Sequence, residues 1–214
     1  LAVYAAADRL SCYNCRFTGW QDTIFNGDPM TCNMKKLMLP DFFQASEVPI
    51  VHKFYRNYFK DCYVCGDVDY IFGPNTAFFD HCEIHSIARV SEEKAYITAA
   101  STPAGQEFGL IFSHCRITGE EPDSVYLGRP WRDCAKTAFI CCELGDHICP
   151  EGWQNWGKVR AEVLSDYIEY GNFGPGADCS GRSPLSRCLV NPEVETYFSK
   201  ENVLVGEDGW IPAE

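Results

Sequence analysis

The chain has 214 residues, of which 46% are hydrophobic and 22% charged, as is usual for a soluble globular protein with one sizeable core and one domain. Its formal net charge of −12 argues against nucleic acid or an anionic membrane surface as a partner. No apolar stretch is long enough and free enough of charge to cross a bilayer.

The first seven residues, LAVYAAA, are apolar, but they contain no initiator methionine and no basic segment. They are too short for a signal peptide with its flanks. We interpret these residues as part of a strand, so that the given sequence begins within a strand, and we expect earlier N-terminal coils to be missing.

A short pattern recurs along the chain: a polar residue, then Cys, then alternating residues, then a turn. Copies begin at Asn14, Asp61, His81, His114 and Cys141. The second and third copies lie 20 residues apart, and the other intervals are longer. Repeats of about this period are typical of solenoids whose units stack their apolar faces, and the period of two within each copy indicates strands. The pattern predicts an all-β parallel β-helix in a single domain, with the repeated cysteines forming an interior ladder.

Two parts of the chain depart from this pattern. Residues 27–56 contain Met, Pro and Phe at irregular spacing, so we predict a loop excursion near a cleft in place of a coil. From Pro150 onward the chain is rich in Trp, Tyr, Gly and Pro. There we expect a short helix starting between Glu193 and Tyr197, and loops packed over the last coils.

Three charged residues stand inside apolar runs: Asp22 in GWQDT, Asp69 in GDVDYIFG and Arg129 in YLGRPW. A charge in such surroundings loses hydration on folding, which is costly unless the charge is paired or hydrogen-bonded. Burial and a nearby like charge also separate the pKa values of two carboxylates, which creates an acid and a base. The pattern therefore indicates a catalytic site. Asp67, two residues before Asp69, is interpreted as a structural neighbour of that site.

The segments QDT, DYIFG and LGRPW, at residues 21–23, 69–73 and 127–131, resemble the pectin methylesterase family closely. The likeness runs from about Val3 to Trp210, and the long interval between Asp22 and Asp69 is similar to that of bacterial-looking members. It implies a right-handed parallel β-helix that hydrolyses the C6 methyl ester of galacturonate in pectin, a methylated homogalacturonan, without metal or cofactor. It also implies a monomer that is secreted or extracellular.

By this resemblance, Asp69 matches the nucleophile that attacks the ester carbonyl and forms a covalent acyl-enzyme. Asp22 matches the general acid that protonates departing methanol and then acts as base on the water that frees the enzyme. Gln21 matches an amide that donates to the oxyanion. Arg129 matches the arginine that pairs with the nucleophile and keeps it ionised.

The resemblance also bears on substrate contacts. Trp131 and Tyr70 are expected to stack on sugar rings beside the ester. The family places another Gln one strand before QDT, and counting back from residues 8–9 puts it just ahead of residue 1, so we expect it to be missing. Trp153 and Trp156 are interpreted as core or lid aromatics instead.

The residues alone leave other interpretations open. Aspartates in Asp-Thr and Gly-Asp pairs are common in turns, and Arg129 could be a surface arginine beside a Gly-Arg-Pro turn. A polygalacturonase or a pectate lyase would share the β-helix, but we find the motifs of neither family. An inactive or incomplete pectin-binding β-helix would keep the fold without the catalysis.

The 13 cysteines include two C-x-x-C pairs, Cys12 with Cys15 and Cys62 with Cys65, whose spacing occurs in zinc ribbons. Alignment of the repeats puts the two pairs out of register, which disfavours structural zinc. We predict instead that most cysteines are reduced and buried as small hydrophobic residues.

Overall fold

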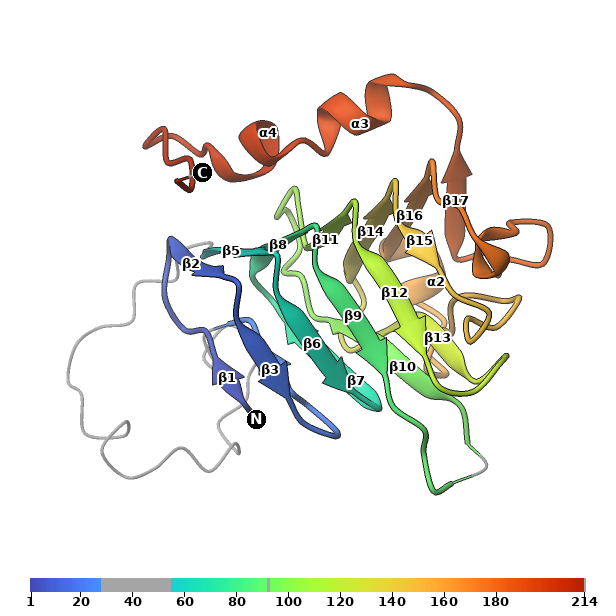
Figure 1. Ribbon diagram of the computed structural model, residues 1–214. Coiled ribbons are helices and arrows are strands. Elements are labelled where there is room, and N and C mark those ends of the chain that lie inside the picture. Colours follow the sequence, from blue (N-terminus) through green and yellow to red (C-terminus); the bar gives the residue numbers. More distant parts are fainter. Residues whose placement is uncertain (28–54, 92, 214) are drawn as a thin grey trace.

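The computed structural model describes residues 1–27, 55–91 and 93–213. Three parallel sheets run along the molecule, and the chain visits them in turn to form successive coils (Figure 1). This arrangement is a parallel β-helix, as the repeats predict. The predicted excursion over residues 27–56 falls almost wholly on residues 28–54, which lie outside the described residues.

Each sheet collects strands from successive coils. The first sheet contains β1 (Val3–Tyr4), β4 (Ile24–Phe25), β7 (Val68–Gly73), β10 (Ala95–Ala100) and β13 (Val125–Pro130). The second contains β2 (Leu10–Tyr13), β5 (Arg56–Lys60), β8 (Thr76–Asp80), β11 (Leu110–Ser113), β14 (Lys136–Ile140), β16 (Asp166–Tyr170) and β17 (Ser186–Leu189). The third contains β3 (Arg16–Thr18), β6 (Tyr63–Gly66), β9 (Glu83–Ser86), β12 (Arg116–Gly119) and β15 (Glu143–Leu144).

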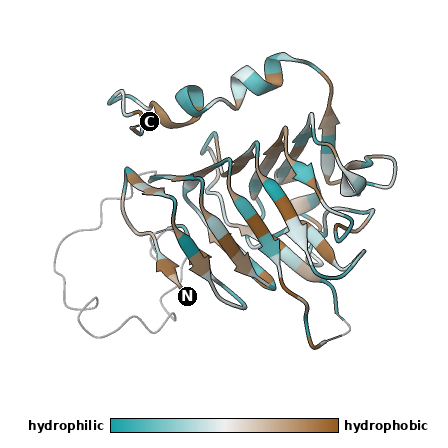
Figure 2. Ribbon diagram, viewed as in Figure 1, coloured by the Kyte–Doolittle hydropathy of each residue, from teal (hydrophilic) through white to brown (hydrophobic). Residues whose placement is uncertain are grey.

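The interior is built from rows of like residues, one from each coil. The rings of Phe59, Phe79, Phe112 and Phe139 stack along the second sheet at centroid distances of 4.7, 4.8 and 4.5 Å. A row of buried cysteines runs beside them: Cys62, Cys82, Cys115 and Cys142. The predicted cysteine ladder is therefore confirmed. Figure 2 shows hydrophobic and hydrophilic residues alternating along several strands, which follows from one face of each sheet being turned inward.

The polar residue before each ladder cysteine forms a corner between the second and third sheets. Asn14, Asp61, His81, His114 and Cys141 all have φ angles between 51° and 53°. Asn, Asp and His adopt this left-handed conformation more readily than most residues. The repeat therefore encodes the corner of the coil as well as its interior.

The C-terminal segment lies across the outer face of the second sheet (Figure 1). It contains α3 (Glu193–Tyr197), as predicted, and α4 (Lys200–Leu204); the short α2 (Ala161–Leu164) and the 3₁₀ helix η1 (Pro175–Ala177) precede it in the chain. Phe198 and Leu204 pack with Tyr58 and Phe78 in a second hydrophobic cluster. No helix in the described part of the chain is long and apolar enough to span a membrane.

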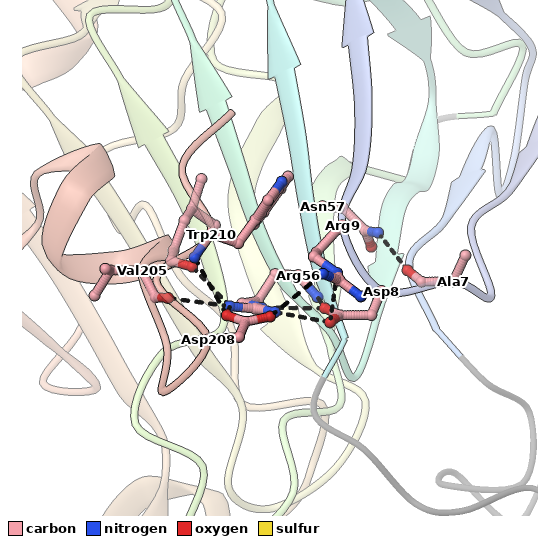
Figure 3. Close-up of polar contacts among 9 residues, drawn as sticks. Ala7, Asp8, Arg9, Arg56, Asn57, Val205, Asp208 and Trp210 are labelled. Carbon is pink, nitrogen blue, oxygen red and sulfur yellow. Dashed lines mark hydrogen bonds and ion pairs between the residues drawn. The ribbon is translucent and has the colours of Figure 1, made fainter. Parts of the chain in front are cut away.

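Arg56 fastens the end of this segment to the start of the second sheet (Figure 3). Its Nη2 donates to Asp8 Oδ2 at 2.7 Å, and its Nη1 donates to Asp208 Oδ1 at 2.7 Å and to the Leu204 carbonyl at 3.0 Å. The Trp210 ring lies 5.3 Å from the guanidinium. One arginine thus joins residues about 200 positions apart in the chain.

Most described cysteines are free, as predicted, but Cys179 and Cys188 form a disulfide that the sequence did not suggest. The disulfide ties η1 to β17 near the last coil. Cys12, Cys15, Cys62 and Cys65 are all free thiols, and none of the candidate metal-ligand groups among the described residues contains one of them.

Candidate active site

The outer face of the first sheet carries a row of side chains from neighbouring strands. The pairing registers place Tyr4, Phe25, Phe72, Ala99 and Arg129 next to one another on β1, β4, β7, β10 and β13. The first four pack into a hydrophobic cluster separate from the main core, and Trp131 joins its edge. The Trp131 ring lies edge-on to Phe72 and Phe25, with centroids 5.7 and 6.4 Å away. These five apolar residues form a platform on the first sheet, and Arg129 lies beside it.

Asp69 interrupts the regular alternation of β7. The step from residue 68 to 71 in β7 faces the step from 96 to 98 in β10, so β7 carries one extra residue. Asp69 has a φ of 51°, a conformation that Asp tolerates better than most residues. As a result, the next side chain, Tyr70, enters the main core, whereas the Asp69 carboxylate reaches Arg129.

Arg129 holds the Asp69 carboxylate by two parallel hydrogen bonds. Its Nε donates to Oδ1 at 2.9 Å and its Nη2 donates to Oδ2 at 2.7 Å, and the two side chains are 15% and 8% exposed. The guanidinium also lies between two rings, 3.9 Å from that of Tyr96 and 3.8 Å from that of Trp156. Bidentate pairing and stacking on both faces fix the arginine, and through it the carboxylate.

Asp22 lies beside Asp69, just before β4 in the first sheet. Its backbone N–H donates to the Val68 carbonyl at 3.1 Å, and the Asp67 N–H donates to the Trp20 carbonyl at 3.2 Å. Asp22 has a φ of 60° and is half-buried. The turn carrying Asp22 is thereby hydrogen-bonded to Asp67 and Val68, the two residues before Asp69, so the two aspartates are neighbours in space.

The two carboxylates differ in their electrostatic surroundings. Burial, followed by the negative charge of Asp69, raises the pKa of Asp22 to about 6. Burial also raises the pKa of Asp69, but the hydrogen bonds and the charge of Arg129 act in the opposite direction. The arginine therefore favours ionisation of Asp69, while the like charge beside Asp22 favours its protonated form. The pair can therefore hold one proton, on Asp22, up to about pH 6.

Gln21 and Trp20 directly precede Asp22 in the chain. Gln21 is exposed, and so is the Trp20 side chain. Asp67 has a structural part here, because its Oδ1 accepts a hydrogen bond from the Val68 N–H at 2.7 Å. Asp67 lies 3.9 Å from Arg89 rather than against Arg129.

Tyr70 does not lie where the resemblance led us to expect it. Its side chain is fully buried in the main core, and its hydroxyl is hydrogen-bonded to Ser86 Oγ at 2.9 Å. The extra residue at Asp69 turns Tyr70 inward. An interior ring is not accessible to a sugar, so the expectation of stacking is wrong for Tyr70, whereas Trp131 remains half-buried beside the outer platform.

Sequence reasoning missed the aromatic partners of Arg129. Trp153 is a core residue as predicted, since it is buried and stacks on Tyr167 at 4.2 Å. Trp156, three residues later, instead lies on the outer face against Arg129. Lys158 follows it, with its Nζ 4.0 Å from the Trp156 ring. No spacing in the sequence connects Trp156 with Arg129, because the two belong to different loops and strands.

Three groups of described residues could hold a metal ion. They are His114 with Cys141 and Glu195, Glu169 with Cys179 and Cys188, and Asp123 with Cys149 and Glu151. In the second group the two cysteines are already joined in a disulfide. None of the three groups includes Asp22, Asp69 or Gln21.

Comparison with known proteins agrees with this fold. A family model described as pectinesterase matches residues 44–207, which is most of the chain. The chain belongs to the pectinesterase family. The matched segment contains Asp69 and Arg129, and residues 21–23 precede it.

Individual relatives extend the match to nearly the whole chain. Pectinesterase 31 of Arabidopsis thaliana is 36% identical over 195 residues, which cover 90% of this chain and 52% of the relative. Among solved structures, a pectin methylesterase from carrot has a TM-score of 0.74 at 26% identity, covering 94% of this chain and 58% of the carrot chain. A pectin methylesterase in complex with a hexasaccharide has a TM-score of 0.68 at 25% identity, covering 97% and 59%. The chain thus spans about half the length of the curated relatives it matches.

Proposed function

We propose that this chain carries the catalytic site of a pectin methylesterase, which hydrolyses the C6 methyl ester of galacturonate to a carboxylate and methanol. The observation that carries the proposal is the arrangement of Asp22, Asp69 and Arg129. It offers a carboxylate that is fixed in direction by an arginine favouring its ionised form and, beside it, a carboxyl group whose pKa is raised to about 6. These are the two protonation states that an aspartyl esterase needs.

In the first half of the reaction, an Asp69 oxygen attacks the ester carbonyl carbon. The oxyanion of the tetrahedral intermediate accepts a hydrogen bond from the exposed Gln21 amide. As the C–O bond to the methoxy group breaks, Asp22 transfers its proton to that oxygen, and methanol leaves. An acyl-enzyme anhydride on Asp69 and an ionised Asp22 remain.

In the second half, the ionised Asp22 takes a proton from water as the water oxygen attacks the acyl carbon. The bond to Asp69 breaks, Asp22 is again protonated, and the galacturonic acid product releases its remaining proton to solvent and leaves as the carboxylate. Arg129 accompanies Asp69 through both halves and favours its ionised form. The related pectin methylesterase bound to a hexasaccharide supports a sugar chain as the substrate, and the half-buried Trp131 at the edge of the apolar platform offers surface for one of its rings.

Methanol release from highly methylated pectin tests this proposal. We expect release by the chain and a loss of at least about 1000-fold in Asp69→Asn, which keeps the shape but not the nucleophile. Asp67→Asn is the matched control, because it removes a carboxylate two residues away that caps Val68, and it should keep most of the activity. A folded chain that releases no methanol, or an Asp69→Asn variant as active as the control, would overturn the esterase and favour a pectin-binding β-helix without catalysis.

A further inference from the structure

The row of corners between the second and third sheets contains two adjacent residues that can bind a metal ion. His114 directly follows β11 and Cys141 directly follows β14, and Ser113 pairs with Ile140, so the two corners lie on neighbouring coils. Glu195 of α3 reaches the same place from the C-terminal segment. The imidazole, the thiol and the carboxylate each offer one ligand atom, and these atoms all lie within 4.8 Å of one another. Donors from two coils and one helix therefore converge on one point.

Cys141 is the unusual member of this row. Its φ of 53° is left-handed, a conformation that is strained for most residues other than Gly, Asn, Asp and His. The preceding corners are formed by residue types that tolerate it: Asn14, Asp61, His81 and His114. Strained residues of this kind cluster at functional sites. The position of the Cys141 thiol therefore suggests a role beyond forming the corner.

The His114 ring is held in an orientation that suits a ligand. Its Nδ1 lies 3.0 Å from Ser113 Oγ, and its ring stacks on that of His81 with centroids 5.1 Å apart. When Nδ1 carries the proton and donates to the Ser113 hydroxyl, Nε2 keeps a free lone pair, which is the usual arrangement of a metal-bound histidine. Nε2 lies 3.8 Å from Glu195 Oε1. That distance is too long for a hydrogen bond and close to the separation of about 3.4 Å between two ligands of a tetrahedral zinc ion.

The other two candidate groups already contain a competing interaction. In one, Lys94 Nζ lies 2.9 Å from Asp123 and 3.9 Å from Glu151, so a protein cation occupies the place of a metal. In the other, the two cysteines form a disulfide and the glutamate is paired with Arg182. Glu195, by contrast, faces an imidazole that is itself a ligand. Of the three groups among the described residues, this is the one whose donors are all available.

We propose that His114, Cys141 and Glu195 bind one zinc ion, which fastens α3 to the corners of two neighbouring coils. Nitrogen, sulfur and carboxylate oxygen form a donor set that suits Zn²⁺ better than Ca²⁺ or Mg²⁺. When the ion binds, Cys141 Sγ forms a bond to it and the thiol proton goes to solvent. Three protein ligands leave one tetrahedral position for water. The ion would act on the stability of the C-terminal segment, since α3 packs on the second sheet and the candidate active site lies on the first (Figure 1).

Calorimetric titration of the full chain with Zn²⁺, after treatment with EDTA and in a buffer with a reductant that is not a thiol, tests the site. One ion per chain should bind, and Glu195→Gln should raise the dissociation constant at least about tenfold because a charged ligand is lost. Cys141→Asn should have the same effect without disturbing the corner, since Asn14 adopts the same φ. His85→Gln is the matched control. His85 Nε2 also lies close to a glutamate, 3.7 Å from Glu120, but His85 belongs to none of the candidate metal-ligand groups among the described residues.

A second measurement tests whether the ion holds α3 in place. Zn²⁺ at about 100 times its dissociation constant should raise the Tm by roughly 5–10 °C. It should also slow the cleavage of residues 193–213 in limited proteolysis, because α3 can then leave the coils only after a bond to the metal breaks. Neither effect should appear in Glu195→Gln or in Cys141→Asn, and both should remain in His85→Gln.

The zinc site is wrong if Zn²⁺ does not bind, or if Glu195→Gln and Cys141→Asn bind it as tightly as His85→Gln. Binding of several ions per chain without dependence on Glu195 would mean adventitious binding to scattered thiols, and it would overturn the site as well. Zinc that binds but leaves the Tm and the proteolysis of α3 unchanged would overturn its role in fastening the helix. None of these measurements uses methanol release, so the zinc site and the esterase stand or fall separately.

Discussion

Asp22 and Asp69 owe their positions to backbone conformations that few residues adopt. Their φ angles of 60° and 51° are of the kind that costs roughly 1–3 kcal/mol and persists where surrounding bonds hold it. For Asp22 the bond is the one from its N–H to the Val68 carbonyl, and for Asp69 it is the pair of bonds from Arg129. Asn tolerates the same conformation, so Asp→Asn changes test the chemistry of the site with little change in its shape.

The raised pKa of Asp22 predicts the alkaline limit of the reaction. Asp22 must be protonated to donate to methanol, so kcat/KM for methanol release should fall about tenfold per pH unit above about pH 6. At lower pH the rate should fall again as Asp69 becomes protonated. A series of rate measurements from pH 4 to 9 checks this, and a rate that is constant up to pH 8 would contradict the assignment of Asp22 as the acid.

The same pKa predicts an effect on stability. A folded-state pKa raised from 3.8 to about 6 means that the protonated carboxyl is favoured by folding. That contribution is complete below about pH 4 and is lost as the pH rises through about 6. Asp22→Asn should therefore raise the free energy of unfolding at pH 8 by about 1 kcal/mol, because water screens part of a half-exposed charge. Urea unfolding at pH 8 and pH 4 measures it; Asp61→Asn, at an exposed corner, should show no such gain.

The stacking of Trp156 on Arg129 predicts a positioning effect. Trp156→Leu removes one of the two rings that enclose the guanidinium, a contact of about 1–2 kcal/mol, and should lower kcat about tenfold with a smaller change in KM. Trp210→Leu is the matched control, since Trp210 lies over Arg56 far from the site and should leave kcat unchanged. Equal kcat values for the two variants would show that Trp156 does not position the arginine.

At the scale of the elements, the repeat in the sequence corresponds to a coil with an interior Cys, an interior Phe and a left-handed corner. The corner and the ladder were predictable because they recur within a few residues of each other in every copy. The Phe row was less evident, since each Phe precedes its ladder Cys by three residues and lies in the second sheet, whereas the Cys lies after the corner, just before a strand of the third sheet. The stacked rows place equivalent residues of adjacent coils about one strand spacing apart.

The Phe row predicts where the core is most sensitive. Phe112 is fully buried between Phe79 and Phe139, so Phe112→Ala should reduce the free energy of unfolding by about 3–5 kcal/mol. Phe173→Ala removes the same atoms from a ring that is 58% exposed and should cost less than about 0.5 kcal/mol. Denaturant titration of both variants measures the difference. Similar losses would mean that the interior row does not carry the stability of the coils.

The repeats and motifs predicted the parallel β-helix and the residues that gather at Asp69, because both signals are local. Contacts between distant segments could not be predicted in this way. The bonds from Arg56 to Asp8 and Asp208 depend on where the C-terminal segment returns, and the buried pair of Arg182 with Glu169 depends on the fold of the last loops. The Tyr70 side chain was expected on the outer face of the sheet. A single extra residue in β7 turns it inward, and a short sequence motif does not reveal such a bulge.

At the scale of the whole molecule, Arg56 predicts how firmly the C-terminal segment is held. Arg56→Leu removes charge-assisted bonds to two carboxylates and two carbonyls and should reduce the free energy of unfolding by about 2–3 kcal/mol. It should also expose residues 193–213 to limited proteolysis. Arg116→Leu is the control, because its pair with Glu83 lies at the surface and contributes little. Equal protease resistance in both variants would contradict the role of Arg56.

The return of the C-terminal segment changes how the coils depend on one another. In a stack whose units contact only their neighbours, either end can fray while the rest stays folded. Here α4 packs on β8, and Asp208 reaches Arg56 of β5, so a segment that follows the last described coil is bonded to an early one. Fraying at either end then breaks the same contacts. The early and the late coils should therefore unfold together, and the stack of coils should behave as a single cooperative unit.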